Sequence, residues 1–148
     1  MPTEQPEMNV WRSFVRAKAE IGRAIHRELR ERGLSGAQLG ILRVLAEAKN
    51  DGVKLNEISQ RLYVTSGNIT GLIDRLEEGG YIARTTHPED RRITLAVLTP
   101  EGEELFKRIY PAHVARIKRL LSALTAQEQA ALAKLLCRIA DQAQKMEQ

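Results

Sequence analysis

The chain has 148 residues, of which 43% are hydrophobic and 28% charged, as expected for one globular domain, alone or with an appended arm. Aromatic residues make up only 4%, which argues against a protein that stacks single-stranded bases on aromatic side chains. The net charge of +4 suits a polyanionic partner, and a single cysteine, Cys137, excludes an intramolecular disulfide. No signal peptide and no membrane-spanning apolar run is recognisable, so we expect a cytoplasmic protein.

The N-terminal third of the chain predicts a tail and two helices. Residues 1–8 are polar and contain two prolines, which predicts a flexible tail. Apolar residues at helical spacing predict a long helix over 9–31. Five arginines form a second stripe along it, which we interpret as a solvated face with local ion pairs rather than a phosphate-binding surface. Ser35 and Gln38 then form a capping box that starts a mostly buried helix.

The centre of the chain predicts two helices joined by a tight turn. Residues 55–62 are a short amphipathic segment, and residues 63–65 form a turn. Residues 65–78 carry an apolar stripe at helical spacing and a short, polar, uncharged N-terminal half. Thr65 or Ser66 can cap this helix. Helix, turn and helix together predict a helix-turn-helix, in which the second helix enters a DNA major groove.

A hairpin follows the helix-turn-helix. Two glycines end the second helix, and two β-branched runs, 81–86 and 93–98, are joined by a turn that contains Pro88. Residues 53–54 are expected to add a short strand to this sheet. A helix-turn-helix with a basic hairpin behind it is a winged helix, which suits double-stranded DNA.

The C-terminal third predicts two more long helices. Thr99 is the N-cap of the first, and Pro111 lies inside it and should kink it. A second capping box, Thr125 with Glu128, starts the last helix. The first helix and the last two carry apolar stripes that a monomer would leave in water. We therefore expect a homodimer with two-fold symmetry.

Four short motifs carry a resemblance to a known family: Thr70-x-x-Ile73-Asp74-Arg75-Leu76-Glu77, Gly80-Tyr81-Ile82-x-Arg84, Asp90-Arg91-Arg92 and Leu98-Thr99-x-x-Gly102. With them, most of the chain resembles the MarR family of bacterial transcription regulators. The resemblance implies a mainly α chain with a small β-hairpin wing, an α+β fold. It also implies one interlocked domain, with 9–49 and 100–147 as the helical dimerisation region and 50–99 as the winged helix-turn-helix.

The predicted recognition helix supplies most of the candidate DNA contacts. Hydroxyl and amide groups can bond base edges, so we expect base contacts from Ser66, Asn68 and Thr70. Thr65 and Arg75 are candidates for phosphate or base contacts.

The predicted wing supplies the remaining DNA contacts. Arg84 and Arg91 should support the wing or touch phosphate, and Arg92 should reach the minor groove. Asp90 should pair with a wing arginine and hold the tip of the hairpin.

These features and the resemblance together predict a sequence-specific regulator that binds double-stranded DNA as a homodimer on a pseudo-palindromic operator. The resemblance implies that it is an effector-responsive repressor. The resemblance implies a site for a phenolic or aromatic effector between the dimer helices and the winged helix. Trp11, His26, Tyr63 and Tyr110 are the candidates to line it, although Trp11 and Tyr63 are equally well explained by packing. The alternative function is a winged-helix module that binds proteins and has no affinity for DNA.

Other chemistries find no support in the sequence. The motifs of hydrolases, nucleotide-binding loops and zinc proteases are absent, so we expect neither an enzyme nor a cofactor. The three histidines, His26, His87 and His113, are too far apart to predict a metal site. Cys137 lies on the apolar face of the last helix, where an inert, packed thiol is expected.

Overall fold

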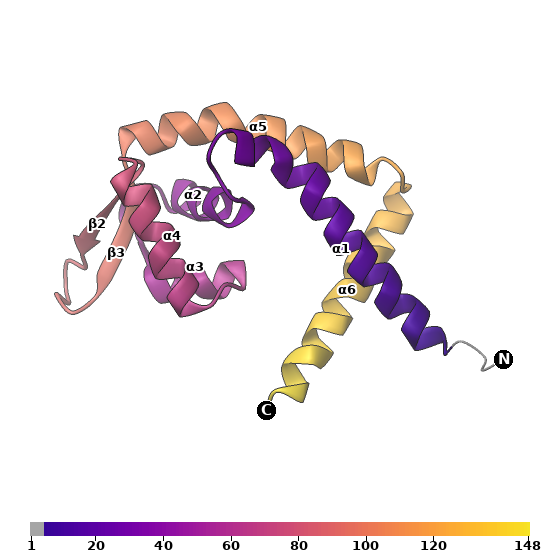
Figure 1. Cartoon of the computed structure of the whole chain (residues 1–148). Coiled ribbons are helices and arrows are strands. Elements are labelled where there is room, and N and C mark those ends of the chain that lie inside the picture. Colours follow the sequence, from indigo (N-terminus) through magenta and orange to yellow (C-terminus); the bar gives the residue numbers. More distant parts are fainter. Residues whose placement is uncertain (1–4) are drawn as a thin grey trace. The chain divides into compact units, whose positions relative to one another are not determined.

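The computed structural model describes residues 5–148 of the chain (Figure 1). Its elements are α1 (Pro6–Glu31), α2 (Gly36–Ala48), the 3-10 helix η1 (Lys49–Asp51), β1 (Val53–Lys54), α3 (Leu55–Leu62), α4 (Ser66–Glu78), β2 (Ile82–Thr86), β3 (Thr94–Leu98), α5 (Pro100–Leu121) and α6 (Ala126–Met146). The predicted mainly α chain with a β-hairpin wing is thereby confirmed.

The first helix starts earlier than predicted. Pro6 is the first residue of α1, a position that proline favours because its fixed φ suits the helix and its missing N–H has no helical acceptor. The prediction of a flexible tail is therefore wrong for residues 6–8, which are helical. The part of that prediction that concerns residues 1–4 lies outside the described residues.

The chain divides at Pro111 into two compact units, Met1–Pro111 and Ala112–Gln148. The helix α5 continues through Pro111 without interruption, although proline removes one of its hydrogen bonds. The second unit consists of the end of α5, a turn and α6. The predicted capping box at the start of α6 is confirmed, since the Thr125 hydroxyl accepts from Glu128 N and the Glu128 carboxylate accepts from Thr125 N.

The core of the first unit lies where α2, α3 and α4 meet the sheet. Its fully buried side chains include Ile41, Leu42, Val44, Leu45, Ile58 and Ile73. On α4, the predicted apolar stripe is confirmed, because Ile69, Ile73 and Leu76 are buried and Leu72 packs against them. Each such side chain contributes about 1.5–3 kcal/mol when it is removed from water. The opposite face of α4 is thus left for solvent or a partner.

The sheet has three antiparallel strands in the order β1-β3-β2. β1 pairs through Val53 with Ala96, which confirms the predicted short strand. β2 and β3 pair from Ile82↔Leu98 to Thr86↔Thr94, so β2 is an edge strand. α4 lies beside β2, the strand at the outer edge of the hairpin (Figure 1).

A close contact ties the base of the hairpin to α5. The Thr99 hydroxyl donates to Gly80 O at 2.6 Å and accepts from Gly102 N at 3.0 Å. A Cβ at position 102 would lie 1.9 Å from Tyr81 O, so only glycine fits here. Gly80 has φ +79°, the left-handed conformation that ends α4 and starts the hairpin.

The apolar faces of the terminal helices are exposed. On α1, Val10 and Trp11 are exposed, and on α6 Leu135 is 51% exposed. α6 has no buried residue at all. Cys137 is exposed as well, so the expectation of a packed thiol is wrong for the single chain. Among the described residues, no helix combines the length and the apolar character needed to cross a bilayer.

Candidate nucleic-acid interface

The turn between α3 and α4 sets the direction of α4. Tyr63 adopts the left-handed conformation, with φ +53° and ψ 40°, and Val64 N donates to Ser59 O at 3.0 Å. The chain then becomes extended at Thr65, whose hydroxyl accepts from Asn68 N at 3.4 Å and caps α4. The helix-turn-helix and the Thr65 cap are confirmed.

The N-terminal half of α4 is a polar surface. Ser66, Asn68 and Thr70 are all exposed, and the Thr70 hydroxyl donates to Ser66 O at 3.1 Å within the helix. Within the described chain, no group bonds the side-chain amide of Asn68, which leaves it able to reach a base edge. The free N–H groups and positive dipole end of a helix attract phosphate. This surface therefore offers donors to phosphate, and both donors and acceptors to base edges.

Arg75 extends the same surface toward the C-terminal end of α4. Asn68 and Arg75 are seven residues apart and lie on one face of the helix, with Gly71 between them. A Cβ at Gly67 or Gly71 would meet nothing within 4 Å, so neither glycine is required by packing. The helix backbone can accordingly come close to a partner at both positions.

At the tip of the hairpin, Asp90 holds Arg92. Asp90 Oδ1 accepts from Arg92 N at 3.0 Å and from Nε at 3.1 Å, and Oδ2 accepts from a terminal guanidinium nitrogen at 3.2 Å. The predicted pairing of Asp90 with a wing arginine is thus present. These bonds from Arg92 hold the pKa of Asp90 below its usual value of 3.8.

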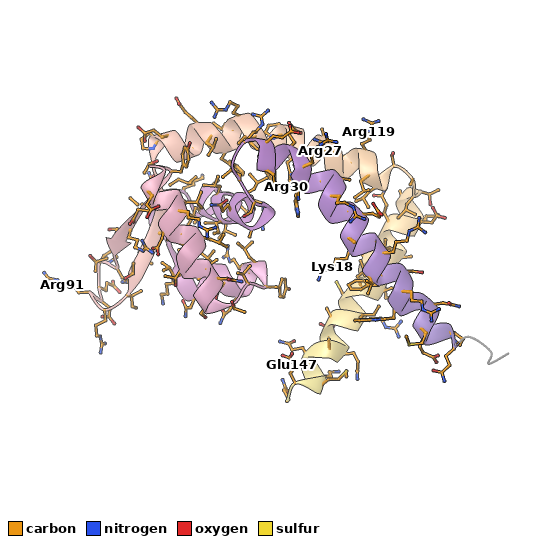
Figure 2. All side chains as sticks on the ribbon, in the orientation of Figure 1. Lys18, Arg27, Arg30, Arg91, Arg119 and Glu147 are labelled. Atoms are coloured by element: carbon orange, nitrogen blue, oxygen red, sulfur yellow. The ribbon has the colours of Figure 1, made fainter. Side chains whose placement is uncertain are left out.

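Both tip arginines stay accessible. The Arg92 side chain is 90% exposed although it is paired, so its guanidinium keeps donors for a second partner. Arg91 is exposed too and projects away from the hairpin (Figure 2). The wing therefore carries two cationic side chains, one held in a fixed direction by Asp90 and one extended into solvent.

Arg84 lies midway along β2, away from the hairpin tip, and is bonded to side chains of α4. Its guanidinium donates to Asp74 and, at 3.0 Å, to Glu77, and its backbone N donates to Glu77 at 3.1 Å. The bond to Asp74, together with Glu77, raises the pKa of the guanidinium. Of the two roles predicted for Arg84, wing support is the one that this geometry favours. Sequence reasoning missed Asp74 and Glu77, although their spacing of three on α4 was a signal.

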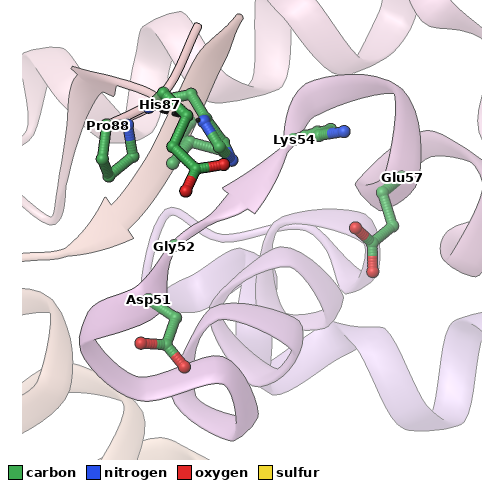
Figure 3. A pocket seen from close by; sticks show the side chains of 8 residues that line it. Asp51, Gly52, Lys54, Glu57, His87 and Pro88 are labelled. Carbon is green, nitrogen blue, oxygen red and sulfur yellow. Dashed lines mark hydrogen bonds between the residues drawn. The ribbon is translucent and has the colours of Figure 1, made fainter.

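A hollow of about 400 Å³ lies on the other side of the wing (Figure 3). Asp51, Glu57 and Glu89 line it with Lys54 and His87, and His87 Nδ1 accepts from Glu89 N at 3.1 Å. Three carboxylates make this surface unsuitable for phosphate. In residues 5–148, no group of three or more His, Cys, Asp or Glu side chains could hold a metal ion.

In residues 5–148, the four candidate effector residues lie in different surroundings. Trp11 stacks on Phe14 and lines a hollow of about 350 Å³ along α1, to which none of the other three contributes. Tyr110 stacks on Phe106 against the core. The half-buried His26 packs on Gly36, where any Cβ would strike its ring.

The fourth candidate, Tyr63, differs from the others. It is 97% exposed, so explaining it as a packing residue is wrong for this chain.

Comparisons with known proteins find relatives over most of the chain. The profile of the MarR family matches residues 32–93. The chain is 37% identical over 129 residues to the HTH-type transcriptional regulator YkoM of Bacillus subtilis, covering 87% of this chain and 82% of YkoM. It is 33% identical to the HTH-type transcriptional repressor YetL of Bacillus subtilis, over 71% of this chain and 63% of YetL.

A solved structure extends the likeness to nearly the whole fold. Sco3205, a MarR family transcriptional regulator from Streptomyces coelicolor crystallised in complex with DNA, superposes with a TM-score of 0.85 at 28% identity. The likeness covers 94% of this chain and 92% of Sco3205. The exposed polar face of α4, the arginine-tipped wing and these relatives lead to one conclusion: the chain belongs to the MarR family of transcriptional regulators.

Proposed function

We propose that the protein is a homodimeric repressor that binds a pseudo-palindromic operator in double-stranded DNA and releases it when an effector binds. The observation that carries the proposal is the pairing of two exposed surfaces in one unit. One is the N-terminal half of α4, and the other is the hairpin tip with Arg91 and Arg92. Sco3205, crystallised with DNA, and the repressor YetL support it. The site of action is then the bacterial cytoplasm, and no catalysis is part of the proposal.

In this proposal α4 enters the major groove. Ser66, Asn68 and Thr70 contact base edges, and Thr65 and Arg75 contact phosphate or bases. The Asn68 amide is suited to bidentate bonds with adenine, because it has both a donor and an acceptor.

The wing reaches the adjacent minor groove. Arg92, held in direction by Asp90, inserts where A·T-rich sequence narrows the groove and deepens its negative potential. Arg91 contacts phosphate beside it. Arg92 therefore reads groove shape, whereas α4 reads bases.

The exposed apolar faces of α1 and α6 form the dimer in this proposal. A second copy of these helices would shield side chains such as Trp11, Leu135 and Ile139. A two-fold dimer presents two α4 helices to successive major grooves, about 34 Å apart on the DNA. Residues 9–49 and 100–147 are thus proposed as the dimerisation region.

The effector is proposed to be a phenolic or aromatic acid that binds between the dimer helices and the winged helix. Trp11, His26 and Tyr110 are candidate lining residues, and Tyr63 reaches such a site only if the partner subunit covers it. An effector can shift the equilibrium between DNA-binding states only by its difference in affinity for them.

Selection of bound DNA from a random pool tests the core of the proposal. We expect recovery of a two-fold related sequence, and binding that weakens steeply as salt rises, because each neutralised phosphate releases counterions. A pool that yields no enriched sequence, with no salt-dependent shift on any fragment, would contradict DNA recognition and favour a protein-binding module.

The selected operator then tests the effector. A thermal-shift screen of aromatic acids identifies binders, and titration of the operator complex with each binder measures coupling. We expect at least one binder to release DNA. Binders that leave operator affinity unchanged would refute the effector mechanism and leave the DNA proposal intact.

A further inference from the structure

The contact between α4 and β2 contains more bonds than an ordinary surface ion pair. Arg84 donates to two carboxylates with its guanidinium and to Glu77 Oε2 with its backbone N–H. Asp74 and Glu77 are three residues apart, so they lie on the same side of α4. We call Asp74, Glu77 and Arg84 the wing bracket. It joins the helix to the hairpin through a side chain and through the main chain.

The main-chain bond fixes the hairpin direction. β2 is an edge strand, and an N–H on its outer side has no acceptor in the sheet. Glu77 supplies that acceptor at Arg84, which lies midway along β2. The hairpin continues from this point to its tip, where Arg92 lies. The wing bracket therefore sets the direction of the hairpin relative to α4, and with it the position of Arg92.

The charges of the bracket are otherwise unfavourable. Asp74, Glu77 and Glu78 lie toward the C-terminus of α4, where the helix dipole disfavours acids. They also repel DNA phosphate. Arg84, whose side chain is only 27% exposed, neutralises part of this charge. Carboxylates that hinder both the helix and DNA binding are explained if they act on the wing.

We propose that Asp74 and Glu77, through Arg84, are positioning residues that determine how much Arg92 contributes to DNA affinity. None of the three needs to touch DNA for this role. The inference rests on the proposed binding of DNA by α4 and the wing, and it adds residues whose effect on affinity is indirect.

Glu77→Gln against Glu78→Gln provides a matched test. Both variants remove one negative charge from neighbouring positions of α4. Of these two glutamates, Glu77 is the one that an arginine holds in the described residues. Loss of a negative charge by itself strengthens binding to a polyanion. We expect Glu78→Gln to bind the operator as tightly as the native protein or more tightly. Glu77→Gln should bind it at least about threefold more weakly, within the range of couplings between contacting residues.

A double-mutant cycle with Arg92→Ala separates positioning from general structural support. If Glu77 acts by directing Arg92, the effect of Glu77→Gln on affinity should disappear in the Arg92→Ala background. An unchanged loss in that background would overturn the proposal, because Glu77 would then act on α4 itself. Equal affinities for Glu77→Gln and Glu78→Gln would overturn it as well.

Arg84→Lys covers the case in which Glu77→Gln is poorly folded, as judged by circular dichroism and melting temperature. Lysine keeps the charge but cannot bond two carboxylates with fixed geometry. It should lower operator affinity in the native background and not in the Arg92→Ala background, and any other result contradicts the proposal. If the native protein binds the operator but the variants show no coupling to Arg92, only this inference is refuted. If the native protein binds no DNA, the proposed function is refuted.

Discussion

The helix-turn-helix with its hairpin and the terminal helices use their apolar residues in opposite ways. Between Leu39 and Ile82, the apolar side chains that face inward are almost all buried, and side chains cap the N-termini of α2 and α4. α6 has a comparable apolar stripe and a full capping box, yet it buries none of it. Local helix signals are therefore equally strong in both regions. What differs is whether one chain supplies the second surface, which is the physical basis for expecting a partner.

The largest effect is expected from Leu135→Arg. This side chain lies on the exposed apolar face of α6, and a charge buried there without a partner costs about 3–5 kcal/mol. We expect the dimer to dissociate in light scattering and operator binding to be lost. Ala130→Arg, on the opposite side of α6 by helical period, is the matched control and should stay dimeric. A native protein that is a stable monomer at micromolar concentration would contradict the expectation that a second copy covers the apolar face of α6.

Leu42→Ala tests the other region. Leu42 lies on α2 and is fully buried in the core of the first unit, so its truncation should lower the free energy of unfolding by about 2–5 kcal/mol. Chemical denaturation measures this loss. The loss of stability caused by Leu135→Ala should be larger at high protein concentration than at low, because the contacts that it weakens form only on association. If both variants depended equally on concentration, the winged helix would not have an independent core.

Asn68→Ala separates base reading from docking. Losing a bidentate base contact should weaken binding to the selected operator by about 1–3 kcal/mol. The loss on random DNA should be smaller, as measured by competition in a gel shift. Equal losses on both DNAs would show that Asn68 only positions the backbone.

Arg92→Ala should have a smaller and broader effect. It should weaken binding to many sites, most where the flanks are A·T-rich, and reduce the salt slope by about one unit. Lys134→Ala on α6 is the control for a generic loss of charge. If the two variants behave alike, the wing does not touch DNA.

The smallest expected effect is that of acid on the wing. Because the bonds from Arg92 lower the pKa of folded Asp90, the pairing stabilises the wing at all pH values above the usual carboxyl pKa. That contribution is lost as pH falls through the lowered pKa of the folded protein. Asp90→Asn should therefore mimic acid at neutral pH and give a milder form of Arg92→Ala, measured by operator affinity. An Asp90→Asn protein that binds like the native one would show that Arg92 needs no support.

The sequence allowed prediction of the elements and of those side chains whose partners are nearby in the chain. The stripe of Ile69, Ile73 and Leu76 follows from helical period, and Asp90 and Arg92 are only two residues apart. Arg84 was left with two possible roles, because the choice depends on how β2 lies against α4. Only the folded structure sets that arrangement.

Two other expectations failed because of surroundings that a sequence does not contain. For Tyr63, packing was one of two explanations left open, and it fails because the side chain at this left-handed turn is 97% exposed. Cys137 was expected to be covered by its apolar neighbours on α6, and those neighbours are themselves exposed.

Gly102 has a consequence for how this protein can vary. Position 102 touches a backbone carbonyl, and a carbonyl cannot move aside as a flexible side chain does. In a library with every residue at each position, Gly102 should return only glycine among functional clones. Gly22, where a Cβ would meet nothing within 4 Å of the chain, should return many residues unless the partner subunit lies against it. The tolerance of Gly22 would thus map the assembly, whereas the intolerance of Gly102 reports on the fold of a single chain.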